Sequence, residues 1–275
     1  MLAKRIITGV VGGAFTIFVI YEGNWLFFIM MALLALGSWY EYGNLAARLK
    51  AAVADRTGAV WLIAMMGAYW YGSVKLMMLF AVVMLLWLLT KTVLFHGQVK
   101  PVDSAYTMYG LLYVGCGFLS LLALRNGLLG SYLTGSFSSV MLEPARFFTF
   151  LLIFSTWASD TFAFAVGKWK GKTKLCPTIS PGKTREGAIG GFIGTVLTAL
   201  IFSAVFQFSL LHGFVIGLIV AVTAPMGDLA ESILKRLCQV KDSGSIIPGH
   251  GGVLDRFDSL LFAAPAVYVY LTLIA

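Results

Sequence analysis

Apolar segments recur along the whole chain at lengths that suit a lipid bilayer. Mean hydropathy is +0.89 and 12% of the 275 residues are charged, a composition unlike that of ordinary soluble domains. A helix needs about 20 apolar residues to cross the hydrocarbon core. We place such segments at 6–21, 24–46, 58–73, 76–95, 104–125, 147–167, 187–208, 210–226 and 257–275. The pattern predicts an all-α polytopic integral membrane protein with about nine transmembrane helices.

The positions of Lys and Arg predict the orientation of the chain. Cytoplasmic loops of membrane proteins collect these residues. With the N-terminus inside, nine spans place 17 of the 20 basic residues on the cytoplasmic side and leave Lys75, Arg125 and Arg146 outside. We therefore expect a cytoplasmic N-terminus and an outside C-terminus.

Polar residues divide the chain into two regions. Residues 1–146 read as an N-terminal transmembrane helix bundle with little chemistry. Residues 147–275 read as a C-terminal transmembrane catalytic region with cytoplasmic loops at 168–186 and 227–256. That region holds seven of the 12 acidic residues: Asp160, Glu186, Asp228, Glu231, Asp242, Asp255 and Asp258. In a chain that is 59% hydrophobic, this concentration of carboxylates predicts a functional site.

Charge and cysteine usage narrow the classes of partner. The net charge of +8 suits anionic lipids or nucleotide phosphates, because the basic residues adjoin membrane segments without a nucleic-acid-binding motif. Cys116, Cys176 and Cys238 lack the spacing of a zinc site, and two of them fall in cytoplasmic segments, where thiols stay reduced. We expect no nucleic acid, no disulfide and no zinc.

Glycine pairs four residues apart predict close helix packing. Small residues at this spacing let two helices approach each other in lipid. The pairs are Gly9 with Gly13, Gly187 with Gly191, and Gly190 with Gly194.

Asp160 stands inside an otherwise apolar span. A charge at membrane depth costs at least about 2.5 to 3.5 kcal/mol, so it normally has a partner or a function. We interpret Asp160 as a functional carboxylate; the alternative is a neutral or salt-bridged group that only holds helices together.

The basic loop 168–186 contains Ser180-Pro181-Gly182-Lys183-Thr184. This segment is not a phosphate-binding Walker motif, since position 177 is proline and no strand is expected before it. Ser180 or Thr184 is expected to cap the next helix, which would leave backbone amides, Lys183 and the helix dipole facing an anion such as phosphate. The alternative is that these lysines only mark the cytoplasmic side.

Residues Asp228, Glu231, Ser232 and Lys235 recur at i, i+3, i+4 and i+7 and so share one helix face. Two carboxylates one turn apart suit a cation with oxygen ligands, whereas a surface helix held by internal ion pairs is the alternative. Lys235 and Arg236 can meet phosphates.

Asp255 and Asp258 lie three residues apart at the start of the last span, after a glycine-rich loop. Such carboxylates suit Mg²⁺, which takes one or two of them and completes its shell with water and phosphate oxygens. The glycines would let the backbone approach a ligand closely. His250 reads either as a hydrogen-bonding loop residue or as part of the site.

These motifs together resemble the signature of the CDP-diacylglycerol synthase family, also called phosphatidate cytidylyltransferase. The likeness rests on an ordered block, Ser232 to Arg236, Lys241-Asp242 and Pro248 to Asp258. Shorter blocks at Asp160, at Ser180 to Gly187 and at Gly227 to Ser232 also match. Together they cover about residues 155–260, and Phe164 departs from the tyrosine expected there.

The resemblance implies that CTP and phosphatidic acid react to give CDP-diacylglycerol and pyrophosphate, with Mg²⁺ and room for a second cation such as K⁺. It implies metal-site carboxylates at Asp160, Asp228, Glu231, Asp255 and Asp258. It implies catalytic and phosphate-binding residues at Asp228, Lys235, Arg236, Lys241, Asp255, Arg256 and Asp258. Substrate-binding residues would be Lys168, Ser180, Pro181, Lys183, Thr184, Ser232 and His250.

We also expect membrane lipids as partners, and the distribution of Lys and Arg predicts a site on the cytoplasmic side of the membrane. The compact chain without long tails suggests a bacterial cell membrane, and a homodimer is left open. Three other functions use similar parts. A CTP-dependent polyprenol or dolichol kinase would transfer the γ-phosphate to an alcohol. An anion transporter would use the same charges without turnover, and a close relative could act on an ether lipid.

Overall fold

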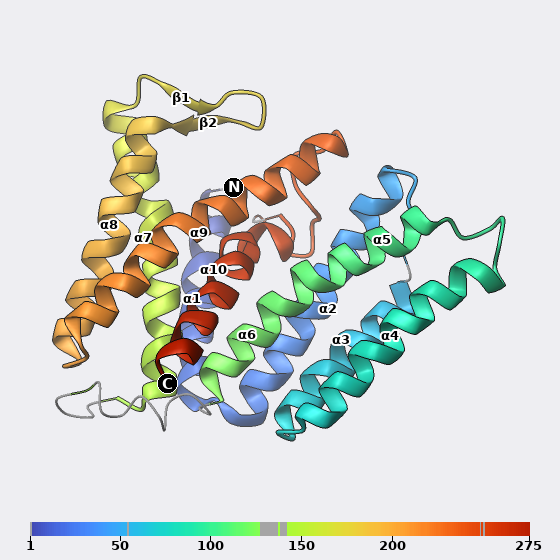
Figure 1. The fold of residues 1–275 in the computed structure, drawn as a ribbon. Helices are drawn as coiled ribbons and strands as arrows, with labels where there is room; N and C mark the ends of the chain where they lie inside the picture. Colours follow the sequence, from blue (N-terminus) through green and yellow to red (C-terminus); the bar gives the residue numbers. More distant parts are fainter. Residues whose placement is uncertain (1, 54, 127–136, 138–141, 248, 250) are drawn as a thin grey trace. The chain divides into compact units, whose positions relative to one another are not determined.

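The computed structural model describes residues 2–53, 55–126, 137, 142–247, 249 and 251–275. Helices make up most of this part of the chain (Figure 1). They are α1 Leu2–Glu22, α2 Asn24–Arg48, α3 Asp55–Trp70, α4 Val74–Leu94, α5 Pro101–Gly110, the π-helical turn η1 Leu111–Gly115, α6 Cys116–Arg125, α7 Pro144–Lys170, α8 Arg185–Val205, α9 Leu210–Leu237 and α10 Leu254–Ile274. Each predicted apolar segment is helical, which confirms a mostly helical polytopic membrane protein.

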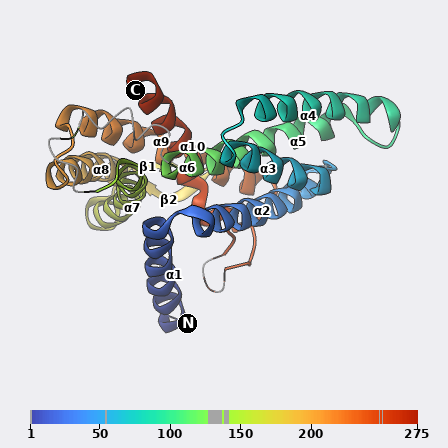
Figure 2. The same ribbon diagram turned by 90° about the horizontal axis from the view of Figure 1, so that it is seen from below.

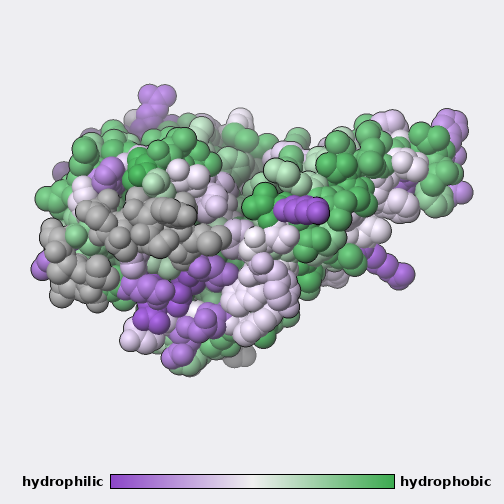
Figure 3. Space-filling model, turned by 60° about the horizontal axis from the view of Figure 1, so that its bottom comes forward, coloured by the Kyte–Doolittle hydropathy of each residue, from purple (hydrophilic) through white to green (hydrophobic). Residues whose placement is uncertain are grey.

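Among the described residues, seven helices are long and apolar enough to cross a membrane. They are α2, α4, the continuous rod Pro101–Arg125, α7, α8, α9 and α10. Helix α3 has 16 residues, and the apolar part of α1 whose side chains the structure describes, Gly9–Glu22, is shorter still. Exposed apolar side chains are abundant, as the green surfaces in Figure 3 illustrate. Seven spans are thus supported, and the full count of nine stays a prediction.

The chain forms two compact units. The first contains Met1–Leu122 and Leu237–Arg256, and the second contains Ala123–Arg236 and Phe257–Ala275. The first unit includes two stretches of the chain because the segment after α9 folds back onto α2. There the thiol of Cys238 donates to the carbonyl of Leu45 at 3.2 Å.

In the first unit, α3 packs against α2 and α4, and α4 also contacts α5, whereas α1 meets α2 only near the turn that joins them (Figure 2). Tyr42 of α2 is fully buried and donates its hydroxyl to the carbonyl of Tyr106 at 2.7 Å. Its ring lies so close to Gly110 that a Cβ there would clash. Glycine at this position therefore lets an aromatic side chain of α2 pack against the start of the η1 turn.

In the second unit, α7 and α8 approach each other closely. A Cβ on Gly187 would lie 2.7 Å from the carbonyl oxygen of Ala163, and one on Gly191 would lie 2.9 Å from that of Ser159. The predicted glycine packing is confirmed here. At Gly13 the structure shows no such packing, because a Cβ there would meet no atom of the described residues within 4 Å.

Candidate active site

The basic loop after α7 folds into a β-hairpin. Strand β1 Lys174–Cys176 pairs antiparallel with β2 Ser180–Thr184 (Figure 1). The prediction that no strand precedes the Gly-Lys-Thr sequence was therefore wrong. These three residues nevertheless lie within β2 itself, so they do not form the loop that a Walker motif requires.

The end of the hairpin caps α8. The hydroxyl of Thr184 accepts the amide of Gly187 at 3.1 Å, which confirms the predicted capping role for this residue. The carboxylate of Glu186 accepts the amides of Lys172 and Thr173 at 3.1 and 3.2 Å. The guanidinium Nε of Arg236 donates to the carbonyl of Ile179 at 3.1 Å. The hairpin is thus attached to the ends of both α8 and α9.

This attachment brings Lys183 to α9. Its ammonium lies 2.7 Å from Oδ2 of Asp228, and the two side chains are 27% and 31% exposed. The ion pair is therefore half-buried and open to solvent. A lysine held in this way can bind an incoming phosphate without a large movement.

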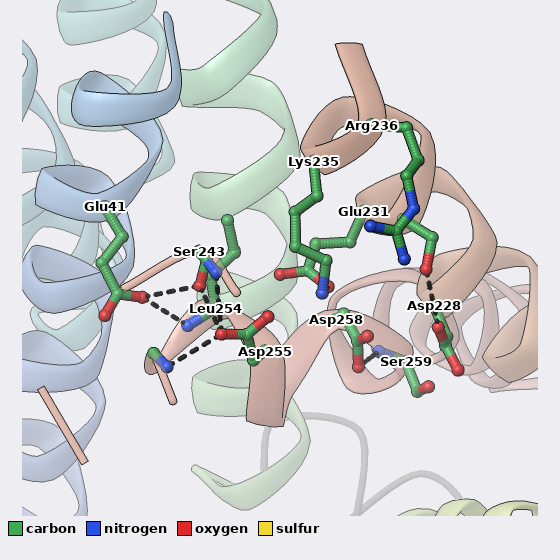
Figure 4. A network of polar contacts seen from close by, with 12 residues as sticks. Glu41, Asp228, Glu231, Lys235, Arg236, Ser243, Leu254, Asp255, Asp258 and Ser259 are labelled. Atoms are coloured by element: carbon green, nitrogen blue, oxygen red, sulfur yellow. Dashed lines mark hydrogen bonds and ion pairs between the residues drawn. The ribbon is translucent and has the colours of Figure 1, made fainter. Parts of the chain in front are cut away.

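Helix α9 presents the predicted row of polar residues on one face (Figure 4). Oδ1 of Asp228 accepts the hydroxyl of Ser232 at 3.3 Å. Glu231 is fully buried and pairs with Lys235 one turn later. A buried ion pair of this kind holds the lysine in place, since separating the two charges would leave one of them uncompensated.

Helix α10 brings a further carboxylate, Asp258, to this cluster. Asp258 interacts electrostatically with Asp228, Asp160 and Lys235. The approach depends on Gly227, because a Cβ there would clash with the backbone carbonyl of Asp258. The second unit thus holds four of the five predicted metal-site carboxylates, Asp160, Asp228, Glu231 and Asp258, as well as Lys183 and Lys235.

The carboxylates of this cluster suit a magnesium ion that takes only one or two of its ligands from the protein. Among the described residues, no three His, Cys, Asp or Glu side chains converge as a ready metal site. Mg²⁺ needs only one or two carboxylates when water and substrate phosphates complete its shell. Asp228 and Asp258 meet this requirement, whereas Glu231 is engaged by Lys235.

The first unit holds a separate polar network around Glu41 and Asp255 (Figure 4). Asp255 Oδ2 accepts the amide and the hydroxyl of Ser243, both at 2.9 Å, and the amide of Gly252 at 2.8 Å. Glu41 of α2 accepts the amides of Val253 and Leu254. Glu41 was missed because the first region was read as having little chemistry. The rule applied to Asp160, a carboxylate inside an apolar span, would have identified it.

Other predicted residues are found at the surface. Lys168 is exposed, with its ammonium 5.9 Å from the ring centroid of Phe164. Pro181, Lys241 and Arg256 are exposed, and Ser180 is half-buried in β2. His250 lies outside the described residues.

Comparison with known proteins places the chain among enzymes of nucleotide chemistry. The model of the cytidylyltransferase family matches residues 3–274. The chain belongs to this family. Phosphatidate cytidylyltransferase of Bacillus subtilis (strain 168) is 33% identical over 281 residues, covering 99% of this chain and 98% of the relative. The enzyme of the same name from Staphylococcus aureus (strain COL) is 32% identical over 273 residues, covering 97% and 98%.

The corresponding protein of Staphylococcus haemolyticus is 36% identical over 204 residues, covering 74% of this chain and 71% of the relative. These matches confirm the resemblance drawn from the motifs. Membership of the cytidylyltransferase family makes the chain a nucleotidyltransferase.

Proposed function

We propose that the protein transfers the cytidylyl group of CTP to phosphatidic acid, giving CDP-diacylglycerol and pyrophosphate in phospholipid biosynthesis. The observation that carries the proposal is the family match over residues 3–274, together with relatives named for this reaction. The Lys183–Asp228 pair and the carboxylates around it supply phosphate binding and charge neutralisation, from which phosphoryl and nucleotidyl transfer draw most of their catalysis.

In this mechanism an oxygen of the phosphatidate phosphate attacks the α-phosphorus of CTP. A new P–O bond forms, and the bond to the β-phosphate breaks with its electron pair leaving on pyrophosphate. The attacking oxygen is already anionic, so no strong general base is needed. Lys183 leaves its ion pair with Asp228 and binds a phosphate oxygen instead. Lys235 and Arg236 stabilise the negative charge that develops on the leaving pyrophosphate.

We propose that Asp228 and Asp258 hold Mg²⁺, with Asp160 and Glu231 supporting them. When bound, the ion would neutralise triphosphate charge and orient the reacting groups. A second cation such as K⁺ stays a prediction.

Further substrate contacts are assigned from the motifs. Ser180 and Ser232 would donate hydrogen bonds to phosphate oxygens. Lys241, Asp255 and Arg256 lie in the first unit, and their catalytic roles are assigned from the signature alone.

We propose the cytoplasmic face of a bacterial cell membrane as the place of reaction. The distribution of Lys and Arg supports this orientation, and the relatives named above come from bacteria. CTP would arrive from the cytoplasm and phosphatidic acid from the inner leaflet.

The test is an assay in detergent micelles with α-labelled CTP, phosphatidic acid and Mg²⁺. We expect label in the lipid phase and pyrophosphate in water, both dependent on phosphatidic acid and Mg²⁺. Labelled CDP with unlabelled lipid would indicate a polyprenol- or dolichol-type kinase instead. Absence of turnover with every acceptor would favour an anion transporter, and a preference for ether-linked phosphatidate would identify the lipid class.

A further inference from the structure

Glu41 is a buried carboxylate in the middle of the first unit. It is 1% exposed and lies on α2, far in sequence from every residue of the family signature. Burying a carboxylate is costly unless hydrogen bonds replace its water shell. Its placement therefore calls for strong donors nearby.

Those donors come from the start of α10. Oε1 of Glu41 accepts the amide of Val253 at 3.0 Å, and Oε2 accepts the amide of Leu254 at 2.9 Å. Amides at a helix N-terminus have no partner within the helix, and the helix dipole favours a negative charge there. Glu41 thus caps α10 from a different helix and fixes where that helix begins.

Ser243 joins this cap to Asp255. Its hydroxyl lies 3.2 Å from Oε2 of Glu41 and 2.9 Å from Oδ2 of Asp255. A hydroxyl has a single hydrogen, so the two carboxylates share it. The orientation of Asp255, in the first turn of α10, is thereby coupled to Glu41.

The glycines of the signature loop are required by the same network. A Cβ on Gly252 would lie 2.5 Å from Oε2 of Glu41, and a Cβ on Gly244 would clash with Oε1. Gly251 has a φ of +87°, which disfavours any other residue. The glycines were predicted to let the backbone approach a ligand. In the structure Gly244 and Gly252 approach Glu41.

We propose that Glu41 is a positioning residue for the transfer reaction, holding Asp255 in its working orientation through Ser243 and the first turn of α10. The inference rests on the proposed function, in which Asp255 is catalytic. Hydrogen-bond partners that orient a metal-site or catalytic residue typically change activity by about 10- to 100-fold when they are removed. Glu41 is expected to act in this way without touching substrate.

The test compares Glu41→Gln with Asp103→Asn. Asp103 is a matched control, because it is also buried and also caps a helix, accepting the amides of Lys100 and Ala52 at 2.7 and 2.8 Å. We expect Glu41→Gln to lower kcat about 10- to 100-fold with KM for CTP within about 3-fold. Asp103→Asn should have the kcat of the wild-type protein at temperatures at which the variant stays folded.

Two further variants separate positioning from folding. Ser243→Ala keeps both amide bonds to Glu41 and should lose most of the same activity. The double variant Glu41→Gln with Ser243→Ala should lose little more activity than either single variant, since both changes break the same hydrogen-bond network. Glu41→Asp should recover part of the loss if its carboxylate reaches the same amides. Equal kcat losses in Glu41→Gln and Asp103→Asn, or a folded Ser243→Ala with wild-type kcat, would overturn the proposal.

Hydrogen exchange of the segment 242–256 provides a readout that needs no turnover. Exchange there should rise in Glu41→Gln and stay unchanged in Asp103→Asn. If the wild-type protein makes no CDP-diacylglycerol, the proposed function fails, while the exchange data still decide whether Glu41 orders the segment that carries Asp255. Unchanged hydrogen exchange in Glu41→Gln would by itself reject the proposal that Glu41 orders the segment that carries Asp255.

Discussion

Lys183 and Asp228 form the contact that best connects the structure to chemistry. One residue comes from a surface hairpin and the other from an apolar helix, and they meet at 2.7 Å with both side chains about one-third exposed or less. Removing one preorganised charged group from a site of this kind typically costs about 100- to 1000-fold in rate.

Lys183→Gln should therefore reduce turnover by about 100-fold or more. The control is Lys174→Gln, an exposed lysine of the same hairpin, which should stay within about 3-fold of wild type. Initial rates at saturating CTP would measure both. Similar losses in the two variants would mean that the hairpin contributes only general positive charge.

Asp255→Asn should abolish turnover while leaving the protein folded. The amide keeps the size of the side chain and one oxygen that can accept from Ser243 and Gly252, but it removes the negative charge. Rates and the unfolding temperature in detergent would be measured on the same preparation. Near-normal activity would refute the catalytic assignment of Asp255.

At the scale of elements, the α7–α8 pair is closely packed. Its glycines place the backbone of α8 against carbonyls of α7. This contact supports the site indirectly, because α7 carries Asp160 and α8 begins where β2 ends.

Gly191→Ala should destabilise the protein by about 1 to 3 kcal/mol, because the new methyl group would overpack the contact with Ser159. Gly13→Ala is the control, since a Cβ there meets no atom within 4 Å. Thermal unfolding in detergent would compare the two. Equal stability of both variants would contradict the close α7–α8 contact.

At the scale of the whole molecule, the predicted orientation can be tested directly. In a variant without native cysteines, Thr178→Cys in the hairpin turn should react with an impermeant maleimide only from the cytoplasmic side. Lys75→Cys at the start of α4 should react only from outside, as both positions are exposed. Labelling of intact and inside-out vesicles would show from which side each introduced cysteine reacts. The reverse pattern would invert the proposed topology.

Much of the architecture was predictable from the sequence. The spacing of apolar residues located every helical segment, and the i, i+3, i+4 pattern correctly placed Asp228, Ser232 and Lys235 on one face of α9. The spacing did not show that Lys183 would pair with Asp228. Nor did it predict the hairpin, because its strands are only three and five residues long and sit among exposed basic residues.

The amino-acid sequence by itself determined that the chain enters a membrane, which segments are helical, and which family motifs the chain carries. These properties follow from hydropathy and residue order, which act over short stretches of chain. Only the tertiary structure decided that Glu41 caps α10 and that Leu237–Arg256 joins the first unit. Those outcomes depend on satisfying a buried carboxylate with amides more than 200 residues away, and no local pattern records such a partner.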